Sequence, residues 1–127
     1  MAFADISILV IPHSEQRYDT VGDWRGDGRI TVSAMGGEDY EFLVALHEFV
    51  EWYLCRKRGI SDAEVTSFDE AYDGGGEPGD ALWAPYRREH QFATFIERQV
   101  AIELGVSWDE YEKALDEVGS DDNPREA

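Results

Sequence analysis

The chain has 127 residues, of which 43% are hydrophobic and 13% aromatic, and its 28 acidic and 11 basic side chains give a formal net charge of −17. This length suits one domain with its own hydrophobic core, and the apolar content excludes a chain that is disordered throughout. So acidic a surface repels nucleic acid and anionic membranes, which leaves an unidentified protein or peptide as the expected partner.

The first third of the chain is predicted to form a sheet. Residues 4–11 are mostly apolar and β-branched, and further strands are expected at 16–24 and 29–35, joined by a hairpin turn at 26–28. The last of these strands alternates apolar with polar side chains, and its predicted buried face consists of Ile30, Val32 and Ala34. We therefore expect a short antiparallel sheet of about three strands.

The rest of the chain is predicted to be helical. Helices are expected at 39–58, from the N-cap Ser61 to about Tyr72, at 85–104 and at 108–118. Strands followed by helices indicate an α+β fold, in which the sheet packs on three to four helices. We expect one such domain over residues 1–118, followed by a polar, disordered tail at 119–127.

The predicted helix 39–58 carries a polar cluster in apolar surroundings. It is apolar nearly all round, as a buried helix would be, and its predicted core face consists of Leu43, Leu46, Val50, Tyr53 and Leu54. Within this pattern lie His47, Glu48 and Glu51. His47 and Glu51 are four residues apart and so stand on neighbouring turns of one face. Buried carboxylates need compensation, which a divalent cation or an arginine would provide.

This His-Glu-x-x-Glu pattern resembles the His-Glu-x-x-His helix of zincin-type metallopeptidases, with a carboxylate in place of the second histidine. The resemblance implies that His47 and Glu51 are metal ligands and that Glu48 is the general base acting on a metal-bound water. It also implies zinc as the metal, with manganese or iron as alternatives because a carboxylate suits harder ions. The pattern also occurs in helices as ordinary surface charge.

A zinc site needs at least a third ligand, and the predicted helix 85–104 can supply it. His90 and Glu97 are seven residues apart and project on nearly the same side of that helix, whose predicted core face consists of Phe92, Phe95, Ile96, Val100 and Leu104. We predict His90 as the third ligand and Glu97 as a fourth ligand or a hydrogen-bonding partner. Asp69, on the short helix between, is a further candidate ligand.

Each candidate also has an ordinary structural interpretation. His90 would then bond a backbone carbonyl, Asp69 would be a solvated helix acid, and Glu97 would pair with a nearby arginine: Arg87, Arg88 or Arg98.

Residues 16–24, 40–51 and 85–93 carry a second resemblance, which extends over most of the chain. They resemble segments of a family of uncharacterised small proteins of tailed phages and prophages. It implies a phage context and no particular function.

Two functional hypotheses follow. In the first, the protein is a divalent-metal-binding protein, a zincin-like hydrolase, although so short a chain leaves little room for a substrate cleft beside a core. In the second, it is a non-catalytic acidic phage protein that binds a host or phage protein, as an inhibitor or a DNA mimic. The polar cluster would then be a core network satisfied by Arg17 or Arg88.

The sequence also indicates a location. Asp5 and the lack of a basic stretch before the first apolar run argue against a signal peptide, and no apolar run approaches the ~20 residues that span a bilayer. The single cysteine, Cys55, excludes an intramolecular disulfide. We expect a cytoplasmic protein, in the host cytoplasm if it is phage-encoded.

Overall fold

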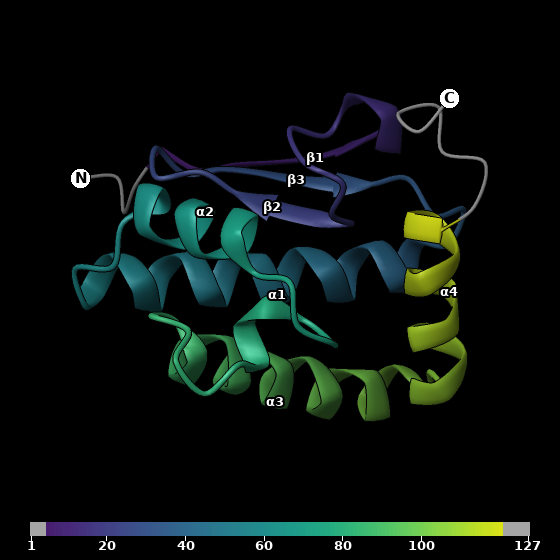
Figure 1. Cartoon of the computed structure of the whole chain (residues 1–127). Coiled ribbons are helices and arrows are strands. Elements are labelled where there is room, and N and C mark those ends of the chain that lie inside the picture. The colour runs from purple at the N-terminus through teal and green to yellow at the C-terminus, as the bar shows by residue number, and fades with distance from the viewer. Residues whose placement is uncertain (1–4, 121–127) are drawn as a thin grey trace.

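The computed structural model describes residues 5–120, with side chains described for residues 5–118. Of the tail expected at 119–127, residues 119 and 120 belong to the last helix, and residues 121–127 lie outside the described part of the chain. The predicted α+β fold is confirmed: a three-stranded sheet is followed by helices (Figure 1). The strands and helices are β1 (Ser7–Ile11), β2 (Gly22–Trp24), β3 (Arg29–Ser33), α1 (Glu38–Lys57), α2 (Asp62–Ala71), α3 (Arg87–Leu104) and α4 (Trp108–Ser120), with 3-10 helices η1 (His13–Glu15) and η2 (Pro78–Asp80).

The sheet is mixed, with strand order β1-β3-β2. The hairpin predicted between β2 and β3 is present and antiparallel, but β1 pairs with β3 in parallel, so the prediction of a purely antiparallel sheet was wrong. The cause lies between β1 and β2, where the predicted strand 16–24 begins only at Gly22. The Gln16 side chain instead bonds Thr31 and Ser33, so this segment crosses a face of the sheet before the chain enters β2.

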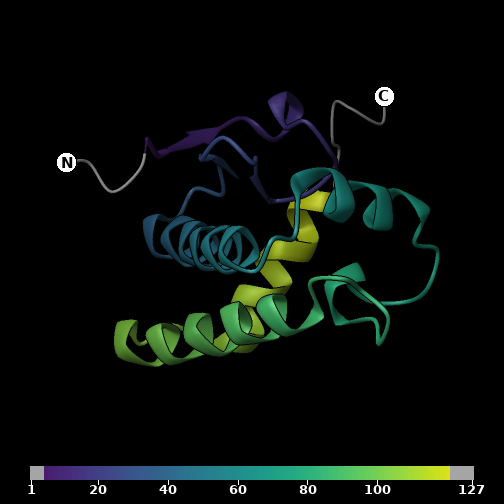
Figure 2. The ribbon, with the colours of Figure 1, turned by 90° about the vertical axis from the view of Figure 1, so that its left-hand side faces the viewer.

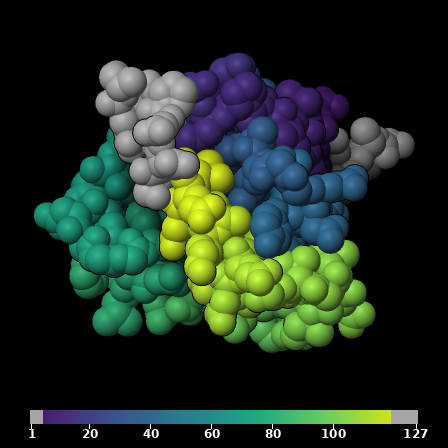
Figure 3. Space-filling view, turned by 90° about the vertical axis from the view of Figure 1, so that its right-hand side faces the viewer, coloured from purple at the N-terminus to yellow at the C-terminus, as the bar shows by residue number. Residues whose placement is uncertain are grey.

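Helix α1 lies between the sheet and α3, so the molecule has three layers (Figures 1 and 2). Ile30 and Val32 of β3 are fully buried as predicted, whereas Ala34, just past the end of the strand, is exposed. Helix α4 runs across the end of the layers, between the α2–η2 region and the residues around the start of α1 (Figure 3). The predicted capping box at the start of α2, formed by Ser61 and Glu64, is present.

The faces predicted for the two central helices are confirmed only in part: Leu43 is fully buried, and His47 and Glu51 are buried within α1 as expected, but most of the other predicted core side chains are not. On α1 the buried side chains include His47 and Glu51, while Leu46, Val50 and Leu54 are only half-buried and Tyr53 is exposed. On α3 the buried stripe is Glu89, His90, Ala93, Glu97 and Ala101, whereas Phe92, Phe95 and Leu104 are exposed. The reason is the same for both helices. The polar stripe of α1, which carries His47 and Glu51, faces the polar stripe of α3, which carries His90 and Glu97, and this contact excludes solvent from both stripes.

The apolar core is therefore divided in two. One cluster gathers around Trp52 and includes Trp24 and Ile30, and the other gathers around Leu43 and includes Val32. His47 and Glu51 lie between these clusters along α1. No helix within residues 5–120 combines the length and the apolar composition that crossing a bilayer requires.

The pairing of Ile8 on β1 with Ile30 on β3 offers a matched test of where the core lies. Ile30 is 0% exposed and Ile8 is 47% exposed. We expect Ile30→Ala to lower the free energy of unfolding by about 2–5 kcal/mol, because it leaves a cavity, and Ile8→Ala to lower it by less than about 1.5 kcal/mol. Equal losses in urea unfolding would contradict this placement of the core.

Candidate metal centre

Two antiparallel helices bring the candidate ligands together (Figure 1). His47 and Glu51 stand one turn apart on α1, and His90 and Glu97 stand two turns apart on α3 with Ala93 between them. Ala93 is fully buried and ends at Cβ, so it occupies little of the space between the helices. His47, Glu51, His90 and Glu97 are each at most 9% exposed. The predicted meeting of the two helices at these residues is present.

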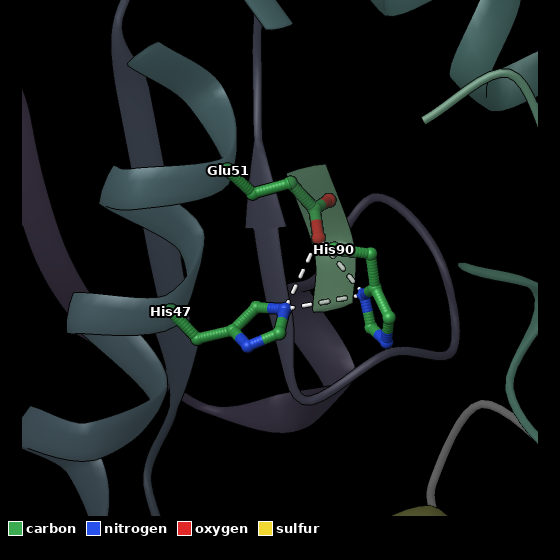
Figure 4. A group of neighbouring side chains, drawn as sticks. All are labelled: His47, Glu51 and His90. Carbon is green, nitrogen blue, oxygen red and sulfur yellow. Dashed lines mark hydrogen bonds and ion pairs between the residues drawn. The ribbon is translucent and has the colours of Figure 1, made fainter. Parts of the chain in front are cut away.

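Three atoms converge at the centre of this contact (Figure 4). His47 Nε2 lies 3.1 Å from Glu51 Oε2 and 3.3 Å from His90 Nδ1, and His90 Nδ1 lies 2.9 Å from Glu51 Oε2. Zinc ligands lie about 2.0–2.2 Å from the ion, so tetrahedral ligands lie about 3.3 Å from one another. The triangle is thus close to the size that one ion requires. His47, Glu51 and His90 form a possible set of metal ligands.

Further groups hold these ligands in place. His47 Nδ1 lies 2.8 Å from Glu97 Oε1, and the other Glu97 oxygen accepts a hydrogen bond from the Tyr111 hydroxyl. Trp24 donates its indole N–H to Glu51 Oε1 at 2.9 Å, which leaves Oε2 to the histidines. Histidines that bind metal commonly donate their second ring N–H to a carboxylate, which fixes the ring orientation. Glu97 therefore orients His47, as one of its two predicted roles requires.

A carboxylate also lies beside the second ring nitrogen of His90. Its Nε2 lies 2.9 Å from a carboxylate oxygen of Glu77, which belongs to the loop between α2 and α3. The backbone of that loop packs closely against the imidazole, because a Cβ added at Gly79 would lie 2.5 Å from His90 Cγ. The interpretation of His90 as a histidine bonded to a backbone carbonyl is replaced by contacts with Glu51 and Glu77.

The charged forms of these residues stabilise each other. Burial lowers the pKa of His90, but its contacts with Glu51 and Glu77 outweigh burial and raise that pKa to about 10. Burial raises the pKa of Glu51, but hydrogen bonds from His47 and His90 outweigh it and lower that pKa to about 2. The pKa of His47 is raised for the same reason as that of His90. Protons on the histidines therefore hold this cluster together, and a metal ion that bound here would displace them.

Glu48, the predicted base, is half-buried and lines a cavity together with His47, Glu51 and His90. Burial raises the pKa of Glu48 well above its usual range, and the neighbouring Glu51 carboxylate raises it further. Its side chain packs on Gly22 of β2, where an added Cβ would lie 2.7 Å from Glu48 Cγ. A cation bound beside Glu48 would favour the ionised form that a base needs.

Asp69, the remaining candidate, lines the same cavity but lies outside the triangle of ligand atoms. Its carboxylate accepts a hydrogen bond from the Tyr86 hydroxyl, and burial raises its pKa. The arginines suggested as partners of the cluster are occupied elsewhere or exposed: Arg17 binds Asp23 and Asp62, and Arg88 lies at the surface.

The cavity has a volume of about 900 Å³. Ligand sites in proteins typically measure about 300–1,000 Å³. The expectation that so short a chain leaves little room for a cleft was therefore wrong, because residues of β2, α1, α2, α3 and α4 surround this space without filling it.

Four residues of the site were not predicted: Trp24, Glu77, Gly79 and Tyr111. Nothing in their local sequence marks them, because their roles arise only when β2, the loop before α3 and α4 meet the central helices. Comparison of the chain with models of protein families, with curated proteins and with solved structures finds no match.

The pKa of His90 leads to a prediction for the metal-free protein. The folded-state pKa of about 10 lies above the ordinary value of 6.5, so the stabilisation is fully present below pH 6.5 and is lost as the pH rises through 10. We expect the free energy of unfolding, measured with chelator present, to fall by more than about 1 kcal/mol across this range. In His90→Gln the fall should be smaller, and an unchanged slope would contradict the assignment.

The contact between Gly79 and His90 leads to a second prediction. Gly79→Ala would push His90 out of the triangle, since the new Cβ would lie 2.7 Å from Nδ1. We expect about 10–100-fold weaker zinc binding in a competition titration, the range found when a group supporting a ligand is lost. Gly75→Ala is the matched control, because an added Cβ there meets no atom within 4 Å. Equal affinities would show that His90 is not a ligand.

Proposed function

We propose that this protein binds one divalent metal ion, zinc in preference to manganese or iron, between α1 and α3, and that it is a zincin-like hydrolase. The observation that carries the proposal is the convergence of His47 Nε2, His90 Nδ1 and Glu51 Oε2, at 2.9–3.3 Å from one another, beside a cavity. Two histidines and one glutamate are a donor set of catalytic zinc sites, which leave the fourth position to water or substrate.

In this proposal the residues of the site have different roles. His47, Glu51 and His90 would hold the ion, and Glu97 would keep the His47 ring in its binding orientation. Zinc bound there would supply a nucleophile at neutral pH, because it lowers the pKa of a water to about 7. Glu48 directly follows His47 on α1 and lines the same cavity, and it would act as the general base.

The lining of the cavity favours a positively charged substrate, such as a basic segment of a peptide. Its basic side chains besides the two histidines are Arg17, already bound by Asp23 and Asp62, and Arg98. Its acidic side chains are far more numerous, and a cation would gain from their summed potential. They are Asp19, Asp23, Glu48, Glu51, Asp62, Asp69, Glu70, Glu77, Asp80, Glu97, Glu112 and Asp116.

Two conservative variants on adjacent turns of α1 test the roles. We expect Glu51→Gln to lose the metal, because the amide cannot supply a charged ligand. We expect Glu48→Gln to keep the metal but to hydrolyse substrate more than about 100-fold more slowly, because a loss of this size is typical when a general base is removed. Elemental mass spectrometry of protein purified without chelator or nickel resin measures the metal. Cleavage of a library of basic peptides measures activity.

A His47→Ala control should lose both metal and activity in that experiment. Equal loss of metal from Glu48→Gln and Glu51→Gln would show that Glu48 is a ligand rather than a base. Absence of metal from the unaltered protein, even after incubation with zinc, manganese and iron, would overturn the proposal.

A second candidate function is a non-catalytic one, in which the protein binds a host or phage protein. Two adjacent large apolar side chains at the surface favour it: Leu82 is 78% exposed and Trp83 71%. The His47–Glu51 cluster would then be a hydrogen-bonded core network. Chelator separates the two functions, because removing a metal that binds the native state lowers the melting temperature, whereas a purely protein network is unaffected. A cytoplasmic location, with Cys55 buried and reduced, suits either function.

A further inference from the structure

The imidazole of His90 stands between two groups of acidic ligands. Its Nδ1 joins the triangle with His47 and Glu51, and its Nε2 faces the loop before α3, 2.9 Å from Glu77 Oε2 and 3.7 Å from Asp80 Oδ1. We infer that His90 Nε2, Glu77 and Asp80 form a second divalent-cation site, so that one imidazole binds two ions. This inference rests on the proposed function, because it shares His90 with the first ion.

The state of His90 Nε2 points to a missing ligand. The His90 side chain is 9% exposed, and its Nε2 is fully shielded from solvent. The nearest group, Glu77 Oε2 at 2.9 Å, forms an ion pair with Nε2, but Nε2 makes no hydrogen bond of acceptable geometry with any residue that the structure describes. An ion bound at Nε2 would use the nitrogen and the carboxylate together.

The distances among Glu77, Asp80 and His90 Nε2 suit a bound metal ion. One ligand atom from each of Glu77, Asp80 and His90 lies within 4.8 Å of the other two. The distances of 2.9 and 3.7 Å from Nε2 lie on either side of the ~3.3 Å that separates tetrahedral ligands of zinc. The two carboxylates are 66% and 57% exposed, so water can complete the coordination and the ion can enter without opening the core.

The short helix η2 explains why the loop presents these groups. Gly79, between Glu77 and Asp80, lets the backbone lie directly against the ring, since a Cβ there would lie within 3 Å of three ring atoms of His90. Pro78, with its fixed φ, begins the helical turn that places Glu77 and Asp80 on the same side of the ring edge. The two ions would lie at opposite nitrogens of one imidazole.

Occupation of both sites requires His90 to lose both ring protons to solvent, as each nitrogen exchanges a proton for a metal bond. The outer ion has one nitrogen and two exposed carboxylates, whereas the inner ion has two buried nitrogens and a buried carboxylate. The inner ion therefore binds more tightly, and the outer ion binds at higher metal concentration.

Zinc titration followed by native mass spectrometry tests the inference. We expect two ions on the unaltered protein and one ion on Glu77→Gln/Asp80→Asn. The matched control Glu103→Gln/Asp109→Asn removes the same charge from two exposed acids away from the cavity and should keep two ions. One ion on all three proteins, or two ions on Glu77→Gln/Asp80→Asn, would overturn the second site and leave the proposed function standing. No ion on any of them would overturn the proposed function itself.

Copper tests whether the ions share the ring. Two Cu²⁺ ions joined by one imidazolate couple their electron spins, so the second equivalent should reduce the electron paramagnetic resonance signal built up by the first. In Glu77→Gln/Asp80→Asn this reduction should disappear. A signal that grows in proportion to two equivalents in the unaltered protein would show that the ions do not share His90.

Discussion

The contact between the polar stripes of α1 and α3 is the constraint on which the rest of the structure depends. It buries two histidines and two carboxylates in the middle of the molecule, where each uncompensated charge would cost several kcal/mol. The groups compensate one another in a tight arrangement, with Glu51 between His47 and His90 and Glu97 behind His47. The apolar core accordingly forms two clusters, one on either side of this arrangement, instead of one.

Elements distant in the sequence are arranged around the same contact. Strand β2 supplies Trp24, α4 supplies Tyr111, and the loop before α3 supplies Glu77, each directed at one of the four central residues. Such support fixes the orientation of the candidate ligands, which would reduce the ordering that binding of an ion requires. A cavity of about 900 Å³ adjoins these residues, as the proposed hydrolase would require.

Local signals in the sequence predicted much of this structure. The capping box at Ser61, the hairpin turn at 26–28 and the four helices are all present, and His47, Glu51 and His90 meet as the spacing indicated. Hydrophobicity indicated that α1 is buried with His47 and Glu51 inside it, but it could not show which apolar side chains of α1 and α3 are fully buried, because the polar sides of the two helices bury each other. The parallel pairing of β1 with β3 and the roles of Glu77 and Gly79 could not be predicted. They depend on tertiary contacts, which produce no repeating pattern of residues in the sequence.

The most direct test of the account is anomalous diffraction from crystals of the protein grown with a limiting amount of zinc. We expect the strongest zinc peak within bonding distance of His47 Nε2, His90 Nδ1 and Glu51 Oε2, at about 2.0–2.2 Å from each. The contact between Glu97 and His47 behind the site should be unchanged. A strongest peak at surface carboxylates, or no peak while the triangle of side chains keeps its present form, would contradict the central claim and identify the cluster as a purely structural network.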